Sequence, residues 1–148
     1  MKVEAILETI SKVFIDTAPV IYYIEGSTSF FPVVDVFFQG LLSRSIKGIV
    51  SPVTLTECLV MPVRLKNAEV QQSFVDFLTN TKEIEMVNID TMVGRQAAEL
   101  RVNYGLKLPD ALQLAVAIRA GCDVFLTNDA DLKRVTELQI VVLGQLEI

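Results

Sequence analysis

The sequence contains no histidine, the side chain that most often acts as a general acid or base in enzymes. This absence excludes Ser-His-Asp and Cys-His catalytic sites and histidine-ligated zinc. The Gly-x-x-x-x-Gly-Lys loop of P-loop nucleotidases is missing as well. If the chain is an enzyme, its chemistry has to depend on other side chains.

Only two cysteines are present, Cys58 and Cys122, and they lie far apart in apolar stretches. They offer neither a zinc knuckle nor a disulfide framework, so we expect reduced thiols in a cytoplasmic protein. The N-terminus carries acidic residues where a signal peptide needs an uninterrupted apolar run. No apolar stretch reaches the ~18 residues of a membrane span, so no such segment is expected.

The chain has 148 residues, enough for one domain with a substantial core. Hydrophobic residues make up 51% of it, and a mean hydropathy of +0.47 excludes a disordered tail. The 13 Lys and Arg residues against 18 Asp and Glu give a net charge of −5. At face value this charge argues against a nucleic-acid partner held by a basic surface.

Short β-branched segments alternate with segments of helical length. The expected strands are residues 13–15, 48–51, 84–89, 122–127 and 139–143, and the expected helices are 17–25, 29–45, 53–80 with a break near Pro62, 90–104 and 109–120. This alternation implies right-handed crossovers with helices on both faces of a sheet. The predicted fold is one three-layer α/β/α domain over residues 1–148, with a central, mostly parallel five-stranded sheet.

Residues 1–11 precede the first expected strand and are predicted to form a helical N-terminal extension. Val3, Ile6, Leu7 and Ile10 fall on one face of such a helix. We expect this face to dock on the body of the protein or on a partner.

Five acidic residues lie within or directly after apolar segments. Asp16 ends the first strand, and Glu57 is the only charge between residues 49 and 63. Asp110 is the only charge in residues 108–118, while Asp129 and Asp131 follow the strand at 122–127. Taken singly, they have structural explanations: a helix cap for Asp16, turn chemistry for Asp129 and Asp131, a helix dipole for Asp110, and a solvated helix face for Glu57.

Taken together, their placement favours a shared site. The carboxyl ends of parallel strands and the N-termini of the helices that follow them meet at one edge of the sheet, where ligands bind in such folds. Carboxylates converging there repel one another, and a divalent cation relieves that repulsion. All-oxygen ligation favours Mg²⁺ or Mn²⁺ over zinc. Removing the five acids leaves 13 against 13 bases, so the excess negative charge equals the predicted metal site.

These five acids lie in four motifs that resemble one known family over nearly the whole chain. The motifs are residues 14–26 (FIDTAPVIYYIEG), 51–57 (SPVTLTE), 109–115 (PDALQLA) and 126–132 (LTNDADL). In this order they resemble the PIN-domain ribonucleases, particularly the VapC-type toxins of toxin-antitoxin pairs and their free-standing relatives. Ala18 and Pro19 depart from the residues more usual after the first acid, and the N-terminal helix is not a general feature of the family.

The resemblance implies metal-dependent hydrolysis of RNA phosphodiester bonds. It implies that Asp16, Glu57, Asp110 and Asp129 are catalytic and ligate one or two Mg²⁺ or Mn²⁺ ions. Asp131 is expected to be an additional ligand, direct or through water, and Glu57 could also orient the attacking water. Thr127 is expected to hydrogen-bond one of the ligand carboxylates.

An RNA substrate needs cations despite the acidic composition. The candidates are Arg64, Lys66, Lys107, Lys133 and Arg134, and the alternative for each is a solvated surface charge. Contacts from such residues to phosphates are not base-specific, so the sequence does not identify the RNA.

A second interpretation is a PIN-like interaction or regulatory protein with weak or no nuclease activity. Residues 30–42 are apolar around more than one helical face. They predict either a wholly buried helix or, as the family resemblance suggests, a homodimer contact or an antitoxin groove. A haloacid-dehalogenase-type phosphatase fits less well, because Ala18 stands where a second Asp is needed.

Overall fold

The computed structural model describes residues 1–26 and 28–148. In chain order the elements are α1 (Val3–Leu7), β1 (Lys12–Ile15), α2 (Thr17–Glu25), α3 (Phe31–Ser43), β2 (Lys47–Val50), α4 (Pro52–Arg64), α5 (Ala68–Asn80), β3 (Ile84–Met86), α6 (Thr91–Tyr104), α7 (Leu108–Arg119), β4 (Val124–Thr127), the 3₁₀ helix η1 (Ala130–Arg134), β5 (Gln139–Val142) and the 3₁₀ turn η2 (Leu143–Gln145). The sheet has the strand order β3-β2-β1-β4-β5, and every pairing in it is parallel. The predicted three-layer α/β/α fold is confirmed.

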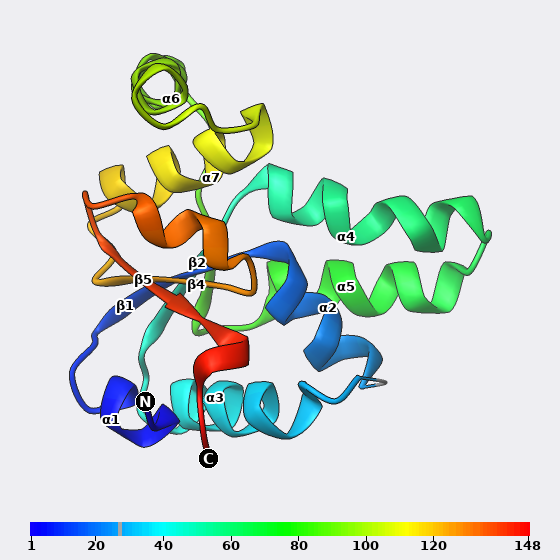
Figure 1. The fold of residues 1–148 in the computed structure, drawn as a ribbon. Coiled ribbons are helices and arrows are strands. Elements are labelled where there is room, and N and C mark those ends of the chain that lie inside the picture. Colours follow the sequence, from blue (N-terminus) through cyan, green and yellow to red (C-terminus); the bar gives the residue numbers. More distant parts are fainter. Residues whose placement is uncertain (27) are drawn as a thin grey trace.

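The sheet is buried on both faces, which explains why its strands show no alternation of polar and apolar residues. Val13 and Ile15 of β1 face the layer built from α1 to α5. Phe14, between them, faces α6 and α7 and stacks on Phe125 of β4 with ring centroids 5.0 Å apart. Figure 1 shows α6 and α7 on one side of the sheet and α1 and α3 on the other.

The N-terminal segment forms the short helix α1, which lies against α3. Val3, Ile6 and Leu7 are at most 3% exposed, and Leu7 lies so close to Gly40 of α3 that a Cβ there would overlap it. The backbone N–H of Val3 donates to the carbonyl of Glu147 at 2.9 Å, so the two ends of the chain lie side by side (Figure 1). The apolar face of this segment docks on the body of the protein.

Helix α3 accounts for the strongly apolar stretch at residues 30–42. Val34, Phe37, Phe38 and Leu41 are fully buried. Phe38 also packs edge-on against Phe77 of α5 with ring centroids 5.4 Å apart. Packing inside the chain therefore explains most of this apolar surface, as the buried-helix interpretation predicted.

The break expected near Pro62 is present and lies at residues 65–67, shortly after that proline. Pro62 sits in the last turn of α4, where its missing N–H removes only one helical hydrogen bond and the helix continues to Arg64. The chain reverses at Lys66, which has a φ of 54°, and Asn67 caps α5 by accepting from the N–H of Val70 at 3.1 Å. Within the described residues, no helix has the length and apolar character needed to cross a membrane.

Candidate active site

The centre of the site is the junction of β1 and β4. These strands pair directly, with Ile15 opposite Leu126, although β2 and β3 continue on one side of β1 and β5 on the far side of β4. The order of the strands reverses between them, which is where ligands bind in doubly wound sheets. The backbone N–H of Asp16 extends the pairing by donating to the carbonyl of Leu126 at 2.9 Å.

Asp16 is a helix cap and a member of the acidic site at once. Its Oδ1 accepts from the N–H of Thr17 at 2.8 Å, which caps α2. Its Oδ2 accepts from the hydroxyl of Thr127 at 2.8 Å, the contact expected for Thr127. Burial raises the pKa of Asp16 to about 6, against the opposing effect of these two hydrogen bonds, and the negative charges of Asp110 and Glu57 raise it further.

Glu57 reaches the site from the second turn of α4, where it is exposed. Its Oε1 accepts from the hydroxyl of Thr17 at 2.7 Å. Thr17 therefore links the two carboxylates, since its N–H bonds Asp16 and its hydroxyl bonds Glu57. The sequence analysis did not identify Thr17, although its position directly after Asp16 was a usable indication.

Asp110 lies in the first turn of α7 and is half-buried. Within the described residues, no group donates a hydrogen bond to its carboxylate. Burial raises its pKa, and the charges of Asp129, Glu57 and Asp131 act in the same direction, while Lys107 opposes them. The pKa of Asp110 is thus raised by the negative charge of three other acids of the site.

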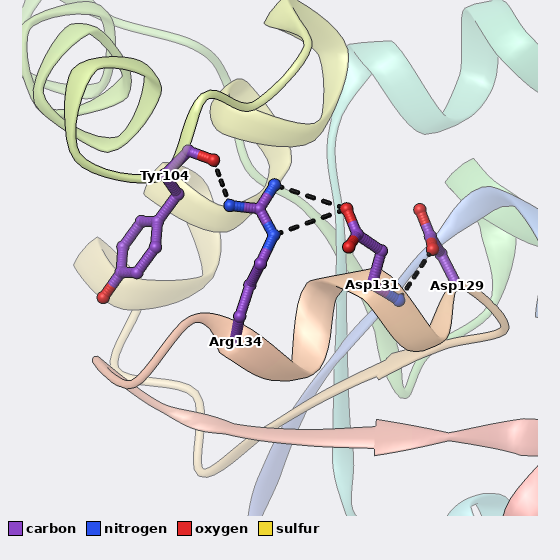
Figure 2. Close-up of polar contacts among 4 residues, drawn as sticks. All are labelled: Tyr104, Asp129, Asp131 and Arg134. Carbon is purple, nitrogen blue, oxygen red and sulfur yellow. Dashed lines mark hydrogen bonds and ion pairs between the residues drawn. The ribbon is translucent and has the colours of Figure 1, made fainter.

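Asp129 and Asp131 begin the 3₁₀ helix η1 (Figure 2). Oδ1 of Asp129 accepts from the N–H of Asp131 at 3.0 Å, and the N–H of Asp129 donates to Oγ1 of Thr127 at 3.1 Å. Thr127 therefore joins the Asp129 loop to Asp16. The turn chemistry predicted for this loop is present and uses only one carboxylate oxygen of Asp129.

Asp131 differs from Asp129 because it is paired with a cation. Oδ2 of Asp131 lies 3.3 Å from Nη2 of Arg134, and Arg134 also donates to the backbone carbonyl of Tyr104 (Figure 2). The same arginine thereby joins η1 to the end of α6. This pairing leaves Asp129 as the better candidate for direct metal ligation.

Three of the acids line a common cleft of about 290 Å³, namely Asp110, Asp129 and Asp131, together with Lys107 and Arg134. The structure therefore brings two of the five predicted substrate-binding cations to the acids. Lys133 lines a different hollow beside Met1 and Ile140.

Of the two remaining cations, Arg64 is the last residue of α4 and Lys66 lies two residues beyond it. The hairpin of α4 and α5 carries this end away from the sheet (Figure 1). The structure thus gives no support to a role at the cleft for Arg64, Lys66 or Lys133, which were among the predicted RNA contacts.

The residues at this edge suit a divalent metal in their chemistry. Five carboxylates come from the cap of α2, from α4, from α7 and from the start of η1, and three of them share a cleft with two cations. Carboxylate oxygens are the protein ligands that Mg²⁺ and Mn²⁺ prefer. Over residues 1–26 and 28–148, however, no three Asp, Glu, Cys or His side chains form a compact group around one point. The carboxylates form two groups. Asp16 lies with Glu57, and Asp110 lies with Asp129 and Asp131. Thr127 joins the two groups through its bonds to Asp16 and Asp129.

A parallel five-stranded sheet with acidic residues at its switch point defines an α/β protein with a ligand site at the carboxyl edge. The family profile of the PIN domain matches residues 13–138, so the chain belongs to the PIN-domain family. The match spans β1 to the loop before β5 and contains all five acids. No curated protein matches the sequence significantly.

Solved structures share this fold at low sequence identity. The toxin-antitoxin complex VapBC2 of Rickettsia felis, bound to a DNA fragment from its promoter, is 20% identical with a TM-score of 0.70, over 88% of this chain and 98% of the matched one. VapC20 of Mycobacterium tuberculosis, a toxin that cleaves the sarcin-ricin loop, is 15% identical with a TM-score of 0.70, over 86% and 98%. A toxin-antitoxin complex from Klebsiella pneumoniae is 22% identical with a TM-score of 0.65, over 88% and 97%.

Proposed function

We propose that the protein is a metal-dependent endoribonuclease that hydrolyses RNA phosphodiester bonds. The observation that carries the proposal is the placement of five carboxylates around the β1–β4 switch point of a PIN-domain chain. Burial is the largest cause of the raised pKa values of Asp16 and Asp110, and the negative charges of neighbouring acids act in the same direction. A site built for neutral ligands has no need of such a concentration of negative charge.

Asp16, Glu57, Asp110 and Asp129 would hold one or two Mg²⁺ or Mn²⁺ ions. When bound, the metal supplies a water of lowered pKa and neutralises charge on the transition state. Asp131 would be an additional ligand, directly or through a water, while it remains paired with Arg134. The contacts from Thr17 and Thr127 fix the directions of the Glu57 and Asp16 carboxylates.

Glu57 is placed so that it would orient the attacking water. It is exposed, and only its Oε1 is engaged by Thr17. The second carboxylate oxygen is therefore available as a hydrogen-bond acceptor for a water that approaches from solvent. Asp16, in contrast, has both oxygens committed to hydrogen bonds.

Lys107 and Arg134 would bind the RNA backbone on either side of the reacting phosphate. They line the same cleft as Asp110, Asp129 and Asp131, so a phosphate held by them lies next to the acids. Contacts of this kind position the backbone and carry no base specificity.

The fold shared with VapC and VapBC structures supports a toxin as the biological role, with an antitoxin protein as its partner. The proposed assembly is a homodimer. The proposed activity would act on RNA in the cytoplasm. A reading frame for a small DNA-binding protein beside the gene is the expected genetic context, and light scattering should give a particle of about twice the mass of the chain.

A cleavage assay tests the enzymatic proposal. The wild-type protein should cut a labelled RNA in Mn²⁺ or Mg²⁺ and stop when EDTA is added, and excess Mn²⁺ should restore cleavage. Calorimetric titration with Mn²⁺ should show binding in the same buffer. Absence of both cleavage and Mn²⁺ binding would favour the interaction protein over the enzyme.

A further inference from the structure

A small polar cluster lies buried between α4 and α7. It consists of Ser51, Thr54 and Gln113, which are 0%, 0% and 1% exposed. Gln113 is the only polar residue in the stretch 111–118 of α7, so its surroundings on that helix are entirely apolar. Burial of an amide among apolar residues costs free energy unless the amide is fully hydrogen-bonded, so this glutamine needs an explanation.

The side chain of Gln113 spans the two helices. Its Oε1 accepts from the hydroxyl of Ser51, and its Nε2 donates to Oγ1 of Thr54 at 2.9 Å. Both partners also form the capping box that begins α4: Oγ of Ser51 accepts from the N–H of Val53 at 3.1 Å, and Oγ1 of Thr54 accepts from the N–H of Ser51 at 3.2 Å. Gln113 is thus bonded to the two side chains that fix the first turn of the α4 backbone.

Each end of this contact is one helical turn from an acid of the site. Asp110 precedes Gln113 by three residues on α7, and Glu57 follows Thr54 by three residues on α4. Residues three apart are neighbours along one side of a helix. The separation of the Glu57 and Asp110 carboxylates therefore depends on how α4 lies against α7, and Gln113 bonds the two helices one turn away.

Hydrogen bonds define this arrangement more sharply than apolar packing does. Apolar contacts have no preferred direction, whereas the two bonds of the Gln113 amide require both the distance and the angle between donor and acceptor to be kept. Within the described residues, the two bonds of Gln113 are the only side-chain hydrogen bonds that join α4 and its cap to α7.

We propose that Gln113 is a positioning residue, which fixes the N-terminus of α4 against α7 and thereby sets the spacing of Glu57 and Asp110 for a divalent cation. This inference rests on the proposed metal-dependent function. Gln113 itself does not contact the metal or the RNA, because its buried amide is hydrogen-bonded to Ser51 and Thr54.

Replacement of Gln113 by methionine tests the inference, because methionine keeps the length of the side chain and removes both hydrogen bonds. At a temperature well below the melting point, the calorimetric Kd for Mn²⁺ should rise by about ten- to a hundredfold, the usual effect of losing a group that orients metal ligands. The matched control is Gln96→Met on α6, a glutamine with no side-chain hydrogen bond among the described residues. It should bind Mn²⁺ as the wild type does.

A second pair of variants keeps the inference testable if Gln113→Met does not fold. Thr54→Val preserves the shape of the side chain and removes the acceptor of Nε2, so it should weaken Mn²⁺ binding. Thr54→Ser retains the hydroxyl and should restore the wild-type Kd. A role in stability alone predicts lower melting temperatures with an unchanged Kd in the folded protein.

Two results would overturn the inference. One of them leaves the proposed function intact, and the other overturns that function as well. If the wild type binds Mn²⁺ and the folded Gln113→Met or Thr54→Val variants bind it equally well, the positioning role is wrong and the proposed function stands. If the wild type itself binds no Mn²⁺, the proposed function falls and the positioning role falls with it.

Discussion

The hydroxyl of Thr127, at the end of β4, donates a 2.8 Å hydrogen bond to Oδ2 of Asp16, at the end of β1. The same Oγ1 accepts from the N–H of Asp129 at 3.1 Å. One buried hydroxyl therefore joins the carboxylate of β1 to the acidic loop after β4. This contact fixes the acids that follow β1 and β4 relative to each other.

Thr127→Val tests the role of this hydroxyl. Valine keeps the shape of threonine and removes the hydrogen bond that lowers the pKa of Asp16, so that pKa should rise above about 6. More of the carboxylate is then protonated near neutral pH, and the acid limb of the pH profile for Mn²⁺-dependent cleavage should move to higher pH. Thr79→Val, which removes an exposed hydroxyl bonded only within α5, is the control. A pH profile unchanged by Thr127→Val would contradict the role assigned to this hydroxyl.

The raised pKa of Asp16 predicts how stability depends on pH in the metal-free protein. The folded pKa, about 6, lies above the ordinary value of 3.8, so the folded state holds this proton more tightly than the unfolded state does. The resulting contribution is fully present below about pH 4 and is lost as the pH rises through 6, by ~1–3 kcal/mol. Asp16→Asn cannot ionise and should be more stable than the wild type at pH 7 in EDTA. Urea unfolding at pH 4 and pH 7 measures this, and an equal or lower stability of the variant at pH 7 would count against the shift.

Arg134 should contribute to RNA binding because it lines the cleft with the acids. In an Asp110→Asn background that prevents cleavage, Arg134→Gln should weaken RNA binding and reduce the slope of log affinity against log salt by about 1. Arg64→Gln, at the far end of α4, should leave both unchanged in the same background. Equal salt slopes for the two variants would remove Arg134 from the RNA-binding surface.

The close packing of α1 on α3 predicts a stability effect at Gly40. A Cβ at this position would overlap Leu7, so Gly40→Ala should destabilise the protein by ~1–3 kcal/mol unless α1 moves. Gly94 of α6 has open space around its Cα, and Gly94→Ala should stabilise by ~0.5–1 kcal/mol through helix propensity. Thermal unfolding compares the two, and a neutral Gly40→Ala would show that the N-terminal helix is loosely held.

The layered fold and the grouping of the acids were predictable from the sequence for a topological reason. Once β1 and β4 were read as parallel strands, Asp16 and the loop of Asp129 had to emerge at the same edge. The chain positions of Glu57 and Asp110 in early helical turns then placed them at that edge too. These inferences need only strand and helix order, which local sequence patterns determine.

The partners of the acids were less predictable because they depend on distances across the fold. Arg134 was recognised as a cation, but its bonds to Asp131 and to the carbonyl of Tyr104 require the spacing of η1 and α6 (Figure 2). Arg64 and Lys66 were among the cations predicted to contact the substrate. Helix α4 runs for 13 residues, about 20 Å in all, and carries them away from the edge.

The central claim is that the carboxylates at the β1–β4 edge carry out metal-dependent RNA cleavage, and two amide variants test it most directly. Asp16→Asn and Asp110→Asn should each abolish Mn²⁺-dependent cleavage of a labelled RNA while circular dichroism shows the folded protein. Asp76→Asn, on the exposed face of α5, should cleave as the wild type does. Cleavage by both site variants at the wild-type rate would contradict the account.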